Sequence, residues 1–254
     1  MRPKKKWGQN FLRNRGAAEK IVAAVEAAPD EVVVEIGPGE GVLTSVLVER
    51  YPGRVTAVEI DPALVASLRS RFGPALEVIE GDALEVPLPT RPFRAVGNLP
   101  YNAGTPILRR VIADPNFRRA VFMLQKEVAD RLVAKPSTPA YGYLTLYTQV
   151  FASAKILMTL EPRSFYPPPK VRSAVVMLDP RNGLQDVDIV LATASASLRN
   201  RRKTLLNNLQ SLHSRGKILA AFEQMSLPET VRAEQLDFAQ FAKLSALLAR
   251  ETTV

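Results

Sequence analysis

The fold is decided by residues 32–41, which read Val-Val-Val-Glu-Ile-Gly-Pro-Gly-Glu-Gly. The five residues at the start of this stretch are mostly apolar and predict a buried strand, and the glycines that follow let the backbone turn sharply. Apolar residues recur at helical spacing before this stretch, over residues 14–28, and after it, over residues 41–50. A strand that leads through a glycine-rich turn into a helix is typical of an open α/β sheet, which binds ligands at the carboxyl ends of its strands.

The same pattern continues along the chain. Predicted strands cover residues 54–60, 76–80, 94–97 and 120–124, and predicted helices alternate with them at residues 62–71, 105–112 and 127–133. This alternation predicts a parallel sheet covered by helices. Residues 144–151 and 171–178 are expected to be the closing strands, and to pair antiparallel because little helical sequence separates them.

A second, smaller domain is predicted at the C-terminus. Residues 179–183 read Asp-Pro-Arg-Asn-Gly and are dense in turn formers, and beyond them amphipathic helical segments replace the strand-like runs. We therefore place one domain at residues 1–180, including a basic arm at residues 1–13, and a helical domain at residues 181–254. Residues 198–209 are expected to form its most basic helix.

The charge of the chain favours a polyanionic partner. Lys and Arg number 34 against 25 Asp and Glu, which gives a net charge of +9. Net charge alone leaves an ordinary basic surface as an equal alternative. Clustering favours nucleic acid, because basic residues gather in the arm and in the predicted basic helix. The predicted RNA contacts are Lys4, Lys5, Lys6, Arg199, Arg201, Arg202 and Lys203.

Composition also excludes several kinds of chemistry. The chain has no cysteine and a single histidine, His213, so neither a disulfide framework nor a zinc site is expected, and we predict no metal. No apolar stretch approaches the length that crosses a bilayer, and the N-terminus lacks the apolar region of a signal peptide. We expect a cytoplasmic protein without a membrane partner.

Three successive strand ends predict a nucleoside site. Gly37 and Gly39 follow the first strand, but Val42 stands where a dinucleotide-binding loop would have its third glycine. Glu59 ends the second strand, where it could accept hydrogen bonds from ribose hydroxyls, and Asp82 ends the third, where it could accept from an adenine amino group. The alternatives are a turn needed only for packing and carboxylates that only cap turns or helices.

The fourth strand ends in Asn98-Leu99-Pro100-Tyr101, which would face the same crevice. Taken alone, this segment could be a proline turn with a packing aromatic. It also carries two carbonyl acceptors and an aromatic ring close together, and Pro100 restricts the backbone that holds them.

At these residues the chain closely resembles a known family, the small-subunit ribosomal RNA adenine N6,N6-dimethyltransferases, in which kasugamycin-resistance enzymes are found. The resemblance rests on Gly8-Gln9-Asn10-Phe11-Leu12, on residues 35–41 and 98–101, on Phe165-Tyr166-Pro167-Pro168-Pro169-Lys170-Val171, and on residues 199–205. It implies a Rossmann-like S-adenosylmethionine-dependent methyltransferase domain, with a mostly parallel seven-stranded sheet and helices on both faces, followed by a small C-terminal α-helical domain.

The resemblance also implies a reaction. Two adjacent adenines near the 3′ end of small-subunit (16S-type) ribosomal RNA would each receive two methyl groups at N6 during ribosome biogenesis, and S-adenosyl-L-homocysteine would be the product of the cofactor. The small ribosomal subunit would be the partner of a monomeric enzyme. Three alternatives remain: a large-subunit rRNA adenine methyltransferase of the macrolide-resistance type, a non-catalytic nucleic-acid-binding factor similar to mitochondrial transcription factors, and a nicotinamide-dependent dehydrogenase.

The chemistry of adenine methylation agrees with this interpretation. The N6 amine is a poor nucleophile because its lone pair is delocalised into the ring. The side-chain carbonyl of Asn98 and the backbone carbonyl of Pro100 could accept its two protons and favour a pyramidal nitrogen. Tyr101 could stack on one face of the base, which is worth roughly 1–3 kcal/mol in single-stranded complexes. Phe165 could close the other face.

The resemblance assigns the remaining site residues. In the family the arm folds over the methionine end of the cofactor, so arm residues join the strand-end residues as predicted cofactor contacts. The predicted set is Gln9, Asn10, Leu12, Gly37, Gly39, Glu59, Ile60, Asp82, Ala83 and Asn98.

Overall fold

The computed structural model describes residues 8–181, 183–184 and 186–249. Contacts within the chain divide it into two units. The first consists of Met1–Ala129 and Ala152–Pro180, and the second of Asp130–Phe151 and Arg181–Val254. The second unit thus includes residues 130–151, which sequence reasoning assigned to the methyltransferase domain.

The first unit is built on a seven-stranded sheet with the order β4-β3-β2-β5-β6-β9-β7. Its five parallel strands are β2 (Val32–Ile36), β3 (Val55–Glu59), β4 (Glu77–Glu80), β5 (Phe93–Asn98) and β6 (Phe117–Gln125), and its antiparallel strands are β7 (Ala152–Leu160) and β9 (Ser173–Pro180). All residues of β2 are buried, as expected for a central strand of a parallel sheet. The predicted α/β fold is confirmed.

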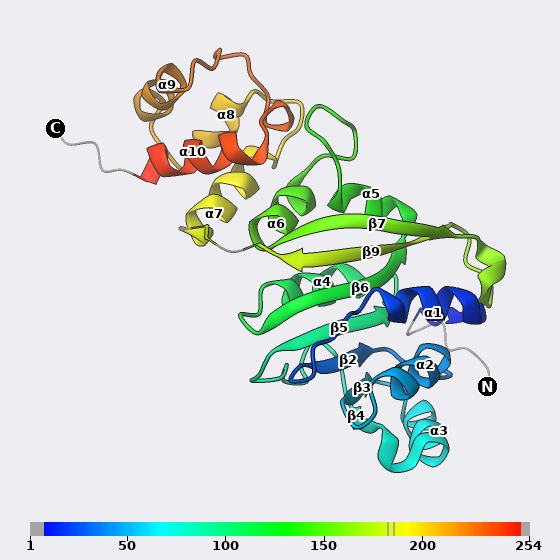
Figure 1. The fold of residues 1–254 in the computed structure, drawn as a ribbon. Coiled ribbons are helices and arrows are strands. Elements are labelled where there is room, and N and C mark those ends of the chain that lie inside the picture. The colour runs from blue at the N-terminus through cyan, green and yellow to red at the C-terminus, as the bar shows by residue number, and fades with distance from the viewer. Residues whose placement is uncertain (1–7, 182, 185, 250–254) are drawn as a thin grey trace. The chain divides into compact units, whose positions relative to one another are not determined.

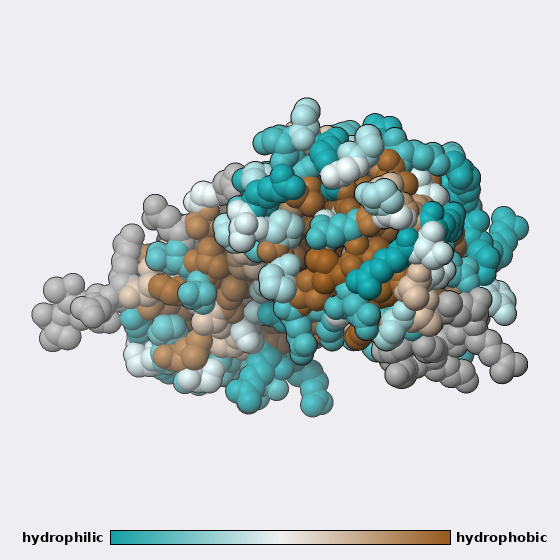
Figure 2. All heavy atoms as spheres, turned by 90° about the horizontal axis from the view of Figure 1, so that it is seen from below, coloured by the Kyte–Doolittle hydropathy of each residue, from teal (hydrophilic) through white to brown (hydrophobic). Residues whose placement is uncertain are grey.

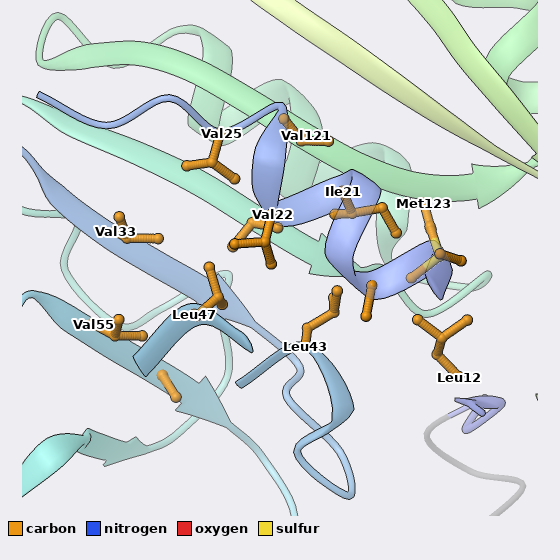
Figure 3. Packing of buried hydrophobic residues seen from close by; sticks show 14 of the residues in the cluster. Leu12, Ile21, Val22, Val25, Val33, Leu43, Leu47, Val55, Val121 and Met123 are labelled. Atoms are coloured by element: carbon orange, nitrogen blue, oxygen red, sulfur yellow. The ribbon is translucent and has the colours of Figure 1, made fainter. Parts of the chain in front are cut away.

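Helices cover both faces of this sheet. They are α1 (Arg15–Ala23), α2 (Val42–Arg50), α3 (Pro62–Phe72), α4 (Gly104–Ile112) and α5 (Lys126–Leu132), the last of which crosses into the second unit. Residues of α1, α2 and α3 share one hydrophobic core with the sheet, as Figure 3 shows for Ile21, Leu43 and Leu47. Helix α4 packs against β6 on the opposite face (Figure 1).

One predicted strand is a helix in the structure. Residues 144–151 belong to α6 (Tyr143–Phe151), and the strand that closes the sheet is β7, directly after it. Rings four residues apart pack along α6, with centroid distances of 6.1 Å between Tyr143 and Tyr147 and 4.9 Å between Tyr147 and Phe151. The aromatic and β-branched residues that suggested a strand therefore pack on a helix instead, because strand propensity yields to tertiary contacts.

The second unit is helical. Besides α6 it contains α7 (Val187–Ser197), α8 (Leu205–Leu209), α9 (Arg215–Gln224) and α10 (Phe238–Ala249). The prediction of one helix over residues 198–209 is wrong. Helix α7 ends before Leu198, and α8 begins only after Thr204, whose side chain caps it by accepting from the Asn207 N–H at 3.3 Å.

Residues 130–151 are packed into this helical unit by buried contacts. Tyr141 is fully buried and donates to the backbone carbonyl of Leu236 at 2.8 Å. Tyr141 and Leu146 belong to the same hydrophobic core as Phe222 and Phe241.

A small two-stranded sheet lies apart from the main one and consists of β1 (Phe11–Leu12) and β8 (Phe165–Tyr166). The two strands are antiparallel, with Phe11 opposite Tyr166 and Leu12 opposite Phe165. This pairing joins two segments that the sequence singled out separately, the arm and the Phe-Tyr-Pro-Pro-Pro segment. Short 3₁₀ helices are also present at Gly73–Ala75, Pro162–Ser164 and Ala233–Gln235.

Candidate active site

A cavity of about 240 Å³ lies at the carboxyl ends of the parallel strands, where open α/β sheets bind ligands. Its lining comes from the arm, from the turn after β2, from the ends of β3 and β4, and from residues 98–103. The structure brings together most of the predicted site residues here: Gln9, Asn10, Gly37, Gly39, Glu59, Ile60, Asp82, Ala83, Asn98, Pro100 and Tyr101.

The glycine turn allows the arm to lie directly on it. Gly37 and Gly39 have φ angles of +66° and +59°, in the left-handed region that favours glycine. A Cβ on Gly39 would stand 2.8 Å from Cδ1 of Phe11, too close for two carbon atoms. The missing side chain of Gly39 is therefore what lets the Phe11 ring cover the turn.

Glu59 joins the glycine turn to the end of β3. Its two carboxyl oxygens accept from the Gly39 N–H at 3.1 Å and from the Asp61 N–H at 3.0 Å. Burial raises the pKa of Glu59, and the backbone donors oppose this rise. Because a carboxylate oxygen accepts more than one hydrogen bond, Glu59 can still accept from a ligand hydroxyl.

Asp82 serves partly as the turn cap that the sequence left open as an alternative. Its Oδ1 accepts from the Leu84 N–H at 2.8 Å, whereas no donor in the described part of the chain reaches Oδ2. The next residue, Ala83, is held from α4, because Arg110 donates to its backbone carbonyl at 2.8 Å. Residues 81–83, which we call the acidic loop, are thus held at Ala83 by Arg110. Asp82 Oδ2 remains available to accept a hydrogen bond from a ligand.

Asn98 lies partly buried at the end of β5, with its side chain against the arm. Its Nδ2 donates to the backbone carbonyl of Asn10 at 2.6 Å. No described residue donates to Asn98 Oδ1. The acceptor end of this amide is therefore available at the cavity.

The residues after Asn98 begin helix α4. The Pro100 carbonyl accepts from the Gly104 N–H at 2.7 Å and from the Ala103 N–H at 3.2 Å, so its acceptor capacity is shared with the backbone. The Tyr101 hydroxyl and the Ser173 hydroxyl are 2.9 Å apart and hydrogen bonded. Burial raises the pKa of Tyr101, and this contact fixes the position of its ring at the cavity wall.

Two predicted contacts do not line the cavity. Leu12 is 4% exposed and Phe165 is 4% exposed, and both belong to the hydrophobic core of the first unit. Figure 3 shows Leu12 beside Met123 and Leu43 at one end of this core. As cross-strand partners, Leu12 and Phe165 share one face of the small sheet, and that face is turned to the interior. The structure therefore does not place Phe165 against a target base.

Sequence reasoning missed Phe11, which lines the cavity, and Arg110, which holds the cavity residue Ala83. Successive side chains of a strand point to opposite faces, so Phe11 and Leu12 cannot both face the cofactor, and this alternation was a usable signal. Arg110 had no signal beyond its place in a basic pair, because its contact with Ala83 joins two elements that are adjacent only in the folded chain.

Glu35 lies in β2, close before the glycine turn, and does not line the cavity. It is fully buried, and one carboxyl oxygen accepts from the Thr44 hydroxyl at 2.7 Å, while the other, Oε1, is buried without a partner among the described residues. Burial raises the pKa of Glu35 to about 8, against the opposing effect of Thr44. Burial therefore favours the neutral form of this side chain.

The predicted RNA contacts in the second unit lie in the turn between α7 and α8. Arg199, Arg201, Arg202 and Lys203 are all exposed, and Arg201 donates to the backbone carbonyl of Pro139 at 2.9 Å. Lys4, Lys5 and Lys6 lie outside the described residues.

The residues of the cavity suit a nucleoside without phosphate. Glu59 and Asp82 offer acceptors, Ile60 is 40% exposed as an apolar surface between them in the chain, and no lysine or arginine is among the described residues that line the cavity. Within the same part of the chain, no group of three or more His, Cys, Asp or Glu residues is placed to hold a metal ion. This composition fits S-adenosylmethionine better than a dinucleotide, whose pyrophosphate needs a binding site.

Known proteins with similar structures support this interpretation. The crystal structure of the 23S rRNA methyltransferase ErmE is similar with a TM-score of 0.78 at 27% identity, over 95% of this chain and 100% of that one. A dimethyladenosine transferase from Plasmodium falciparum is similar with a TM-score of 0.82 at 29% identity, over 92% of this chain and 95% of that one.

Sequence relatives are closer. The proteins named "Ribosomal RNA small subunit methyltransferase A" from Ralstonia nicotianae and from Synechococcus sp. (strain JA-3-3Ab) are 41% and 39% identical to this chain. Each similarity spans 98% of this chain, and 91% and 94% of the respective relatives. The sequence profile of the ribosomal RNA adenine dimethylases matches residues 1–250. The chain therefore belongs to the ribosomal RNA adenine dimethylase family.

Proposed function

We propose that this protein dimethylates N6 of two adjacent adenines near the 3′ end of small-subunit ribosomal RNA, as a step of ribosome biogenesis. The names of its curated relatives support the small subunit as the substrate. The observation in the structure that carries the proposal is the Asn98 amide, which lies at the cavity with its nitrogen bound to the arm and its oxygen available. We propose that the enzyme acts as a monomer in the cytoplasm.

S-adenosylmethionine is the methyl donor, and when bound it supplies an electrophilic methyl group on a sulfonium ion. Glu59 would accept from its ribose hydroxyls and Asp82 Oδ2 from its adenine amino group. Ile60 and Ala83 would lie against the adenine. Gln9, Asn10, Gly37 and Gly39 form the part of the cavity wall that would enclose the methionine portion.

The chain's own residues would prepare the target amine. Asn98 Oδ1 would accept one N6 proton. The Pro100 carbonyl would accept the other in competition with the Ala103 and Gly104 N–H groups, and two such acceptors favour a pyramidal nitrogen with an available lone pair. Tyr101, fixed by Ser173, would stack on the base. Because the amine proton can leave to water after transfer, no histidine or cysteine is needed. Orientation of the two reactants would supply roughly 7–11 kcal/mol of the barrier reduction.

The ribosomal substrate would also need contacts away from the cavity. The exposed turn with Arg199, Arg201, Arg202 and Lys203 is our candidate for phosphate contacts, since phosphates are bound mainly by arginine and lysine.

No helix in the described part of the chain is long and apolar enough to cross a membrane. Figure 2 shows hydrophilic side chains spread over one face of the molecule, with apolar residues between them.

A second candidate function is methylation of large-subunit ribosomal RNA. It is favoured by the similarity to ErmE, which spans nearly all of this chain. The higher identity to the small-subunit enzymes, 39–41% against 27%, favours our first proposal.

Label transfer tests the reaction. Undermethylated small subunits are incubated with tritiated S-adenosylmethionine, and the RNA is digested to nucleosides. We expect label in N6,N6-dimethyladenosine, lowered by about 100-fold or more in Asn98→Ala, because removing one preorganised polar contact costs about 10²–10³ in rate. Asn207→Ala, at an exposed position on α8, should transfer normally. Tight RNA binding without transfer would instead identify a non-catalytic binding factor.

A further inference from the structure

Residues 8–13, which are the described part of the arm and are called the arm below, are held in place by contacts that do not involve Asn98. Strand β1 of the arm pairs with β8, and the Arg13 N–H donates to the Ser164 carbonyl at 2.8 Å. The Arg13 side chain forms an ion pair with Glu40 at 2.8 Å and lies over the Tyr166 ring at 5.4 Å from its centroid. Leu12 anchors the arm in the core below (Figure 3). The backbone of the arm is thus fixed from several directions.

This fixed backbone presents one acceptor to Asn98. The Asn10 carbonyl lies 2.6 Å from Asn98 Nδ2. A carbonyl oxygen can only accept a hydrogen bond, whereas a side-chain amide has a donor end and an acceptor end. If the amide were turned by 180°, two oxygens would face each other at this distance and repel. A closed arm therefore selects one of the two orientations of Asn98, and that orientation leaves Oδ1 at the cavity.

We propose that the Asn10 backbone carbonyl is a positioning group for Asn98, so that closure of the arm sets the orientation of the amide that recognises the target amine. The proposal rests on the proposed function and extends it. The arm then has two roles. It forms part of the cavity wall, and it orients the Asn98 side chain so that Oδ1 faces the cavity. When the arm is open, Asn98 is free to rotate, and only part of its population offers an acceptor to the amine.

The consequence for kinetics is specific. An arm that only covers the cofactor would affect KM for S-adenosylmethionine, and full turnover would return at saturation. An arm that also aims Asn98 affects kcat, and saturation does not restore it. The KM and kcat effects of loosening the arm thus separate the two roles.

Leu12→Ala loosens the arm from the core side without removing a residue that lines the 240 Å³ cavity. We expect kcat for methyl transfer to small-subunit RNA to fall by about 10- to 100-fold at saturating substrates, because the released Asn98 side chain can be displaced as well as rotated, and small displacements of a reacting group cost rate on this scale. Leu47→Ala removes an equally buried leucine of the same core far from Asn98 in the chain, and should keep kcat at temperatures where both variants are folded. If Leu12→Ala does not fold, Arg13→Ala loosens the same arm from the solvent side.

Coupling to Asn98 gives the decisive comparison. In an Asn98→Ala background, Leu12→Ala should cause no further loss of kcat, because the group that the arm orients is gone. In addition, the side-chain amide of Asn98 should give two distinct NMR proton signals in the wild type that broaden in Leu12→Ala.

Full kcat of Leu12→Ala at saturation, or equal losses in both backgrounds, would overturn the inference while leaving the proposed function intact. Absence of methyl transfer by the wild type would overturn the proposed function instead, and the NMR comparison would still decide whether the arm orients Asn98.

Discussion

At the scale of single residues, Gly97 has room for a hydrogen atom but not for a methyl group. A Cβ at this position would stand 2.3 Å from the backbone oxygen of Ile36, on the neighbouring strand β2. Both strands end at the cavity, so any displacement moves Asn98 relative to the glycine turn. The backbone packing of the sheet therefore constrains the position of Asn98.

Gly97→Ala should lower the free energy of unfolding by about 1–3 kcal/mol or more, because overpacking a backbone contact forces the strands apart. Thermal and urea unfolding would measure this loss. Gly142→Ala is the matched control, because nothing lies within 4 Å of the added Cβ. Equal stability of the two variants would contradict the close approach of β5 and β2.

Glu35→Gln should change how stability depends on pH. Burial raises the pKa of Glu35 from 4.5 to about 8, so the folded protein binds a proton that the unfolded chain has already released over this interval. The contribution of Glu35 to stability is thus complete below pH 4.5, decreases as the pH rises, and is lost above pH 8. The advantage of Glu35→Gln over the wild type should grow across this interval, by at most about 1.4 kcal/mol per pH unit, and then stay constant.

Urea unfolding at several pH values tests this, with Glu223→Gln at an exposed position of α9 as a control for loss of a carboxyl group. A constant difference between Glu35→Gln and the wild type from pH 5 to 9 would show that Glu35 is not buried as a neutral acid.

At the scale of elements, helix α4 connects the two halves of the cavity. It begins shortly after Tyr101, and Arg110 near its end holds the Ala83 carbonyl of the acidic loop. The segment that recognises the target amine and the loop that would bind the cofactor adenine are thus joined through one helix.

Arg110→Met should raise KM for S-adenosylmethionine by roughly five- to tenfold, because the loop that carries Asp82 loses a hydrogen bond to a charged group. The value of kcat should change little. The KM of Arg110→Lys should lie between those of the wild type and Arg110→Met. Steady-state kinetics of Arg91→Met, at an exposed position outside the cavity wall, control for the loss of charge. An unchanged KM in Arg110→Met would show that the loop needs no anchor.

The sequence predicted the elements whose signals are local. The run Val32–Ile36, the glycine turn and the Asn98 to Tyr101 segment each carry their pattern within a few residues, and the structure places them as expected. The helix α6 was mistaken for a strand because its aromatic and β-branched residues have strand propensity, and only the packing of rings four residues apart makes them helical.

The burial of Leu12 and Phe165 could not be predicted for a different reason. It depends on the pairing of β1 with β8, two segments far apart in the chain, and on which face of that pair meets the core. The short turn with Arg199 to Lys203 was likewise hidden, because the cap formed by Thr204 decides where α8 begins.

At the scale of the whole molecule, the net charge of +9 predicts salt-sensitive binding to RNA. Arg199→Gln with Arg202→Gln should weaken binding to small-subunit RNA and reduce the log–log salt slope by roughly 0.7 for each single-strand phosphate that the two arginines neutralise. Filter binding at several salt concentrations measures both. KM for S-adenosylmethionine should not change, since these residues do not line the cavity. An unaltered salt slope would place the phosphate-binding residues elsewhere.

The choice between the small and the large subunit is the central claim, and mapping the methylated positions tests it most directly. Small and large subunits that lack adenine dimethylation are incubated together with labelled S-adenosylmethionine, and RNA fragments are analysed by mass spectrometry. We predict four methyl groups, two on each of two adjacent adenines, in a fragment near the 3′ end of small-subunit RNA. Label in large-subunit RNA, or label without N6,N6-dimethyladenosine, would contradict the account.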